Sequence, residues 1–259
     1  MGSNDFQGTR AKLDRAEQHL DELRAQLKIG WEKHLYGIST YDDLGSHETI
    51  VTLLKPKSIF SSYSVIAGEI VHQTRSALEH VIWQMLPNPN KSSGFPVFTL
   101  EHKDPANPKK GYYEGQGLKM IEDINPAAQT LIRSVQPFAT GTDHRLNLLH
   151  EMWNWDKHRL LNMMVIYPQA ISPFYRYLSD NHISILPTIA VPEIDDGAEI
   201  ARVPHPHDFV PGKVQMEAEV GIAIRFADAG PAVGESPEEF LANLLKLTRD
   251  IVGRLIKTI

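Results

Sequence analysis

The apolar residues of this chain repeat with two different periods, and this constrains its fold more than any single motif. In residues 9–34 and 61–86, and after Ser236, they recur every three or four positions, as in an amphipathic helix. Residues 213–226 instead alternate apolar and polar side chains, as does a strand that is wet on one face. Helices at both ends, strands between them and no strand–helix–strand alternation predict an α+β fold, a helical bundle packed against an antiparallel sheet.

Shorter elements fill the middle of the chain. Asn125-Pro126 is typical of a helix start, with proline in the first turn. A further helix is expected over residues 143–160, and Pro168 is expected to end the strand that follows it. The remaining strands are expected at 36–41, 49–54, 161–167, 175–177 and 183–186.

Two segments rich in proline and polar residues, near 88–117 and 187–212, are expected to be long loops that leave one core and return to it. No internal repeat and no composition shift marks a boundary between them. The sequence therefore predicts a single α+β domain over residues 1–259.

Composition narrows the class of protein. Apolar residues make up 42% and charged residues 22% of the chain, as in ordinary soluble globular proteins. The net charge of −6 excludes a uniformly basic, nucleic-acid-coating surface, although not a local basic patch. The absence of cysteine excludes disulfides, thiolate metal sites and a cysteine nucleophile, and it fits a cytoplasmic location. No apolar run has the length of a signal peptide or membrane span, so no membrane partner is expected.

When residues 143–160 are placed on a helical wheel, some charged residues fall inside the arc of apolar side chains. Four polar residues, spaced three or four positions apart, form one narrow stripe along this helix: Asn147, Glu151, Asn154 and His158. Asp156 and Arg159 fall inside the apolar arc and are close enough in sequence to pair. Buried charges are costly unless they are paired or functional. Two interpretations stay open: a structural ion pair, or a site built from Asp156, His158 and Arg159.

The 61–86 helix offers partners for these residues. Its polar face ends at Glu79, and Arg75 and His80 lie at the two borders of its apolar arc. This face is either solvated, with Arg75 extending to water, or it meets the polar stripe of the second helix across a cleft. That cleft would hold Arg75, Glu79, His80, His150, Asn154 and His158. Such a group of charges can bring a histidine pKa close to neutral for acid–base work.

Two runs carry a resemblance to known proteins. Arg75-Ser76-Ala77-Leu78-Glu79-His80-Val81-Ile82-Trp83-Gln84 and Asp156-Lys157-His158-Arg159 resemble a widespread family of uncharacterised bacterial proteins. In that family a helix of the RSALDHLxWQL type precedes one of the DKHR type, and Glu79 stands here where the family has Asp. The likeness covers about residues 60–165 and implies a shared fold without a known activity.

A second resemblance is to the HEPN superfamily of helical ribonucleases and nucleotide-binding proteins. Its motif is an arginine and a histidine on one helix with four to six residues between them. Arg75 and His80 match it, as do Arg145 and His150. The resemblance implies a protein that acts on RNA or a nucleotide, including metal-independent cleavage of RNA at a homodimer interface. The arginine would hold the phosphate and the histidine would move the proton of the ribose 2′-hydroxyl.

Together these observations predict Arg75, His80 and His158 as catalytic residues, with Glu79, His150, Asn154, Asp156 and Arg159 as binding residues. No HExxH, GxxxxGK[ST], GxGxxG or GxSxG motif occurs, so neither a metal nor a cofactor is predicted. Two alternatives remain open. One is a non-catalytic binding or scaffold protein of a bacterial defence or toxin system, and the other is a metal-dependent hydrolase.

Overall fold

The computed structural model describes residues 6–32, 37–54, 60–141, 145–157, 164–178, 183–185, 189–190, 199–207, 209–211, 213–227 and 230–259. The fold is α+β with antiparallel sheets, as the sequence predicts. The chain forms two compact units, described separately below. The helical unit comprises Met1–Ala25, Ser61–Met164 and Phe226–Ile259, and the sheet unit comprises Gln26–Phe60 and Val165–Arg225. The expectation of one domain stays a prediction.

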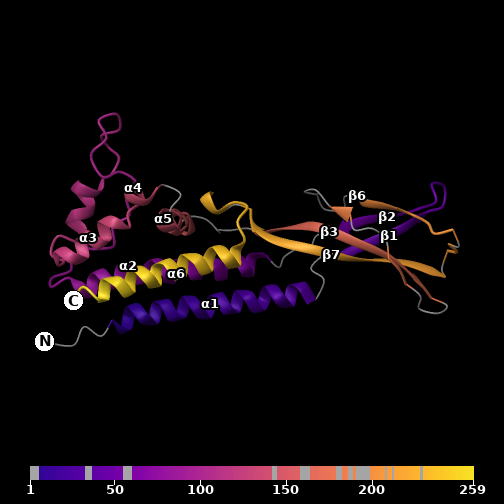
Figure 1. The fold of residues 1–259 in the computed structure, drawn as a ribbon, viewed down its shortest axis with the longest axis horizontal. Helices are drawn as coiled ribbons and strands as arrows, with labels where there is room; N and C mark the ends of the chain where they lie inside the picture. The colour runs from indigo at the N-terminus through magenta and orange to yellow at the C-terminus, as the bar shows by residue number, and fades with distance from the viewer. Residues whose placement is uncertain are drawn as a thin grey trace. The chain divides into compact units, whose positions relative to one another are not determined.

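Three long helices form the frame of the helical unit: α1 (Gln7–Glu32), α2 (Phe60–Met85) and α6 (Pro237–Ile256) (Figure 1). α1 runs antiparallel to α2, because Thr9 donates a hydrogen bond to Gln84 at 2.7 Å while His19 lies 3.3 Å from Glu69. Their shared core consists of fully buried aliphatic side chains, among them Leu20, Leu23, Ile70, Leu78, Ile82, Leu241 and Leu244. No helix in the described part of the chain is long and apolar enough to cross a membrane.

α6 is tied to α1 by ion pairs at both ends. Arg24 contacts Glu238 at 3.0 Å, and Arg249 contacts Asp14 at 3.4 Å. These contacts make α1 antiparallel to α6 as well. The predicted amphipathic helices at the two ends of the chain therefore pack on each other.

Shorter helices complete this unit: α3 (Pro126–Ser134), α4 (Pro137–Thr140), α5 (Arg145–Asp156) and the single turns η1 (Tyr113–Gly117), η2 (Leu118–Met120) and η3 (Gly230–Ala232). The Asn125 side chain caps α3 by accepting a hydrogen bond from the Ala128 amide at 2.9 Å, and Pro126 occupies the first turn. The predicted start of this helix is confirmed.

The segment over residues 88–117 is largely irregular, but it is anchored rather than loose. Phe95 and Tyr113 are fully buried, so the segment contributes two aromatic rings to the core. Gly117 allows this packing, because a Cβ added there would lie 2.7 Å from Tyr113 Cδ2. Only part of this segment is therefore a surface excursion.

The sheet unit contains two sheets. The strands are β1 (Gly37–Asp43), β2 (Glu48–Leu54), β3 (Met164–Tyr177), β4 (Ile183–Ile185), β5 (Ile189–Ala190), β6 (Glu199–Pro204) and β7 (Val214–Phe226). One sheet has the order β1-β2-β6, and the other has the order β4-β3-β5, with β7 also paired to β3. The β1–β2 hairpin and β7 confirm the predicted strands.

Two expectations about strands were wrong. Pro168 does not end a strand, since β3 continues through it to Tyr177. Nor is 187–212 only a loop, because β6 lies within it and pairs with β2 in antiparallel register, Thr49 opposite Val203. Both expectations assumed that proline interrupts a strand. A strand can contain proline where the missing N–H is not needed for a hydrogen bond to the neighbouring strand.

Tyr175 joins the two sheets. Its hydroxyl on β3 lies 3.1 Å from the carbonyl oxygens of Val203 and Pro204 and 3.3 Å from the Thr49 hydroxyl. The side chain is 1% exposed, so the hydroxyl obtains its partners entirely from the other sheet. A buried tyrosine that is satisfied in this way fixes the relative position of β2, β3 and β6.

Candidate functional site

The two helices that the sequence singles out, α2 and α5, lie against each other. A Cβ added at Gly68 of α2 would lie 2.6 Å from Oδ1 of Asp156 on α5. Further along, the guanidinium carbon of Arg75 lies 5.1 Å from the centroid of the Trp153 ring. The glycine permits the close approach at one end, and the cation–π contact holds the other.

Arg75 is buried and tied to its own helix. Its side chain is 3% exposed, and Nη1 pairs with Oε1 of Glu79 at 2.5 Å. Nη2 donates a hydrogen bond to the Phe95 carbonyl at 2.9 Å, while Oε2 of Glu79 accepts one from the Phe95 amide at 3.0 Å. Burial lowers the pKa of Arg75, and the charge of Glu79 opposes this. The pair therefore fastens the loop that carries Phe95 to α2.

Trp153 lies at the centre of several charged and polar groups. Lys157 Nζ lies 2.9 Å from the Trp153 ring centroid, and the His150 ring centroid lies 6.2 Å from it. Burial lowers the pKa of Lys157, as does Arg75, whereas Glu79 raises it. We call Arg75, Glu79, His150, Trp153 and Lys157 the α2–α5 cluster.

His150 is held in its neutral form. Burial, together with the charges of Arg75 and Lys157, lowers its pKa to about 4. The Asn154 amide nitrogen lies 3.0 Å from His150 Nε2. Because an amide NH₂ only donates, Nε2 is the acceptor and the imidazole proton is on Nδ1. His150 thus presents an N–H donor at neutral pH.

Three buried donors in the cluster have no acceptor among the described residues: Arg75 Nε, His150 Nδ1 and Trp153 Nε1. A buried donor without an acceptor costs about 1–3 kcal/mol, and more when the donor is charged. Asn154 and Lys157 are solvent-exposed, so the cluster reaches the surface along α5. The arrangement suits an electron-rich acceptor group such as a phosphate or carboxylate oxygen.

The structure brings together Arg75, Glu79, His150 and Asn154 of the predicted residues. It places His80 elsewhere. His80 is exposed, and its Nδ1 lies 3.2 Å from the position of a Cβ added at Gly8 of α1. On a helix, residues five positions apart point about 140° away from each other, so Arg75 and His80 face different elements.

Asp156 lies beside Gly68 rather than with Arg75. Burial raises the pKa of Asp156, and the nearby His72 opposes this rise only in part. The predicted partners His158 and Arg159 lie outside the described residues. The predicted Asp156–Arg159 pair and the role of His158 therefore stay predictions.

Sequence reasoning missed Trp153 and Lys157 as members of the site. Trp153 was not among the residues predicted for the site, and Lys157 was named only within the Asp156–Arg159 run. The signal was present in their spacing, since side chains four positions apart on a helix are neighbours, which brings the lysine within reach of the tryptophan ring. The Phe95 contribution had no local signal, because it depends on how the loop folds back.

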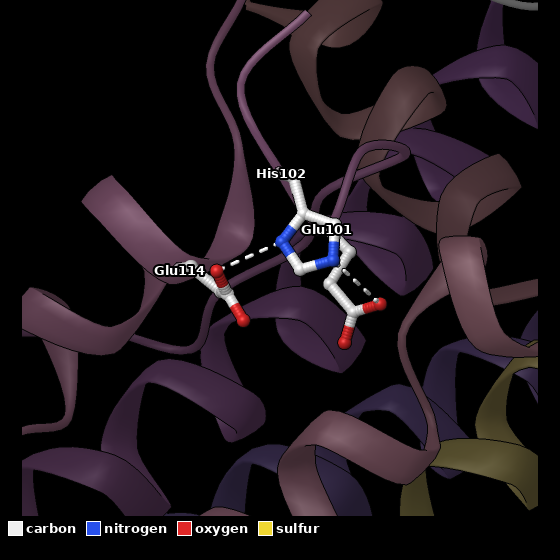
Figure 2. Close-up of side chains that lie close together, drawn as sticks. All are labelled: Glu101, His102 and Glu114. Carbon is white, nitrogen blue, oxygen red and sulfur yellow. Dashed lines mark hydrogen bonds and ion pairs between the residues drawn. The ribbon is translucent and has the colours of Figure 1, made fainter.

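A second group of polar side chains lies on the irregular segment. Three side chains each place one potential ligand atom within 4.8 Å of the others: Glu101, His102 and Glu114 (Figure 2). Such a set could coordinate a divalent cation. His102 Nδ1 lies 2.8 Å from Glu114, His102 Nε2 lies 3.7 Å from Glu101, and Arg133 donates to Glu101 at 2.8 Å. These ion pairs account for the group, and a cation would have to displace some of them.

Comparison of the chain with protein-family models, with curated proteins and with solved structures finds no match.

Proposed function

We propose that this protein binds RNA or a nucleotide through a phosphate group at the α2–α5 cluster. The observation that carries the proposal is the buried Arg75. Within the part of the chain that the structure describes, its Nε lacks an acceptor, as do the buried donors of His150 and Trp153. Arginine and lysine are the usual protein partners of phosphate, and charge-assisted hydrogen bonds to it are about twice as strong as neutral ones.

The balance of charge favours a small local site. Glu79 is already paired with Arg75 and with the Phe95 amide, so Lys157 supplies the uncompensated positive charge of the cluster. The whole chain carries a net charge of −6, which repels nucleic acid elsewhere on the surface. We therefore expect binding that contacts one or two phosphates and weakens only modestly with salt.

The position of His80 favours binding over cleavage. Metal-independent cleavage of RNA needs a proton-transferring group near the phosphate, and His80 faces α1 while Arg75 faces α5. Cleavage by this protein would then depend on His150, which belongs to the cluster, or on His158. Homodimer formation and a cytoplasmic location stay predictions.

Fluorescence anisotropy of a labelled oligouridylate tests the binding proposal. Lys157→Gln removes an exposed charge at the cluster, and Lys246→Gln removes one from the exposed face of α6 as a matched control. We expect Lys157→Gln to weaken binding about tenfold, as for a lost charged contact, while Lys246→Gln leaves it unchanged. Equal affinities of both variants and the wild type, or no binding by the wild type, would overturn the proposal.

A cleavage assay with the same oligonucleotide in excess chelator separates the binding protein from the ribonuclease. Intact RNA with tight binding supports the non-catalytic form. Cleavage that is lost in His158→Ala and retained in His80→Ala would instead establish a ribonuclease whose base is His158.

A further inference from the structure

We propose that the ligand of the α2–α5 cluster is bound by a single phosphate group, and that His150 takes up a proton when this group binds. This inference rests on the proposed function, and it specifies which part of the ligand is recognised and how the site responds to pH.

The chemical type of the buried atoms that lack a hydrogen-bond partner supports a phosphate ligand. Arg75 Nη1 faces Glu79, and the other buried atoms of the cluster that lack a partner among the described residues are all N–H donors: Arg75 Nε, His150 Nδ1 and Trp153 Nε1. Two of them belong to α5 and one to α2. The centroid of the Trp153 ring lies 5.1 Å from the guanidinium carbon of Arg75 and 6.2 Å from the centroid of the His150 ring. A group with several acceptor oxygens can satisfy such a set, whereas a base edge or a hydroxyl brings donors of its own.

The charges that act on His150 are positive. Arg75 acts on it from α2, and Lys157 directly follows the last residue of α5. The loop over residues 94–98 and the η3 turn have no charged side chains, and the buried face of α6 is apolar except for Thr248. Glu79 also lies in the cluster, but its two oxygens are used by Arg75 and the Phe95 amide.

A bound phosphate would reverse this balance. In the free protein, burial and two nearby cations hold the His150 pKa at about 4, so the ring is neutral. A negative charge placed among these cations offsets their repulsion and raises the pKa of the ring. The proton enters at Nε2, so the Asn154 side-chain amide turns to present its oxygen as the acceptor there. Protonation of the bound state then strengthens binding as the pH falls, by up to tenfold per pH unit where His150 is charged only in the complex.

Calorimetry with uridylyl-uridine tests this inference, because its phosphodiester does not titrate near neutral pH. Binding enthalpies are measured in two buffers of different ionisation enthalpy, between about pH 5 and pH 8. We expect a fractional proton uptake that increases toward acid pH and disappears in His150→Gln. The control variant His207→Gln, which changes an exposed histidine of the sheet unit, should retain it. Uridine and inorganic phosphate are titrated in parallel.

The outcomes separate the two proposals. Binding of uridylyl-uridine without proton uptake overturns the role of His150 and leaves the proposed function intact. Binding of uridine as tight as that of the dinucleotide overturns phosphate recognition, and binding of neither overturns both proposals. Inorganic phosphate that binds as tightly as the dinucleotide, with the same loss in His150→Gln, identifies free phosphate as the source of the recognised group. If His150→Gln does not fold, the C2 proton resonance of His150 in the wild type, followed against pH with and without dinucleotide, must show the same rise in pKa.

Discussion

The guanidinium of Arg75 on α2 lies 5.1 Å from the ring centroid of Trp153 on α5, although the two residues are far apart in sequence. This contact joins the helices that carry most of the predicted site residues. It also places a buried cation next to donors that have no acceptor among the described residues. The contact therefore stabilises the helical unit and shapes the proposed binding site, and the following variants separate the two roles.

The Arg75–Glu79 pair is expected to behave as a buried ion pair. Glu79→Gln leaves the Arg75 charge without its partner, which should lower the free energy of unfolding by about 3–5 kcal/mol. Combining it with Arg75→Met removes the unpaired charge, so part of that loss should return. Urea denaturation of the two single variants and the double variant measures the coupling. Strictly additive effects would show that the pair is not coupled.

Gly68 and Gly253 form a matched pair of glycines within helices. A Cβ at Gly253 meets nothing within 4 Å, so Gly253→Ala should stabilise the protein by about 1 kcal/mol through helix propensity. A Cβ at Gly68 meets the Asp156 carboxylate, so Gly68→Ala should lose that gain or destabilise the protein. Thermal unfolding of both variants measures the difference. Equal stabilisation would contradict the close approach of α2 and α5.

His150 should make stability depend on pH in a defined window. Its pKa falls from 6.5 to about 4 on folding, so the unfolded chain binds a proton more readily than the folded chain between these values. Stability should therefore decrease as the pH falls from about 6.5 to about 4, by on the order of 3 kcal/mol for this group. In His150→Gln the stability curve should be flatter over that window. An unchanged slope would place His150 in a solvated environment.

Tyr175 provides a test of the sheet unit. Tyr175→Phe removes a hydroxyl that contacts Val203 and Pro204 and leaves the ring in place. We expect a loss of about 1 kcal/mol in the free energy of unfolding, the usual net value of one hydrogen bond. Tyr41→Phe, which changes an exposed tyrosine on β1, is the control and should be neutral. A neutral Tyr175→Phe would mean that the hydroxyl does not hold the two sheets together.

The sequence predicted the long elements because their periodicity is strong. α1, α2 and β7 were expected within a few residues of their bounds, since each carries an apolar face long enough to determine its own structure. It did not predict β6, a short strand in a proline-rich segment that is stabilised mainly by pairing with β2. Such pairing depends on tertiary contacts, which local patterns do not encode.

The candidate site was predictable in part. The charges of α2 and α5 allowed a cleft between the two helices as one of two interpretations, and Arg75, Glu79, His150 and Asn154 do come together. The environment of His80 could not be predicted. The helical wheel places Arg75 and His80 at opposite borders of the apolar arc, but it does not show which neighbouring helix covers each border. The packing of α1 against α2 places His80 beside Gly8. The contribution of Phe95 was equally hidden, since it is made by a loop carbonyl and amide.

The most direct test of the account is the indole N–H resonance of Trp153 in a ¹⁵N-labelled sample, identified with Trp153→Phe and followed as uridylyl-uridine is added. If a phosphate oxygen accepts a hydrogen bond at the α2–α5 cluster, this resonance should shift progressively downfield and saturate with binding, while the indole resonances of the other tryptophans move little. Binding that leaves the Trp153 resonance in place would contradict the account, because the ligand would then occupy a different part of the protein.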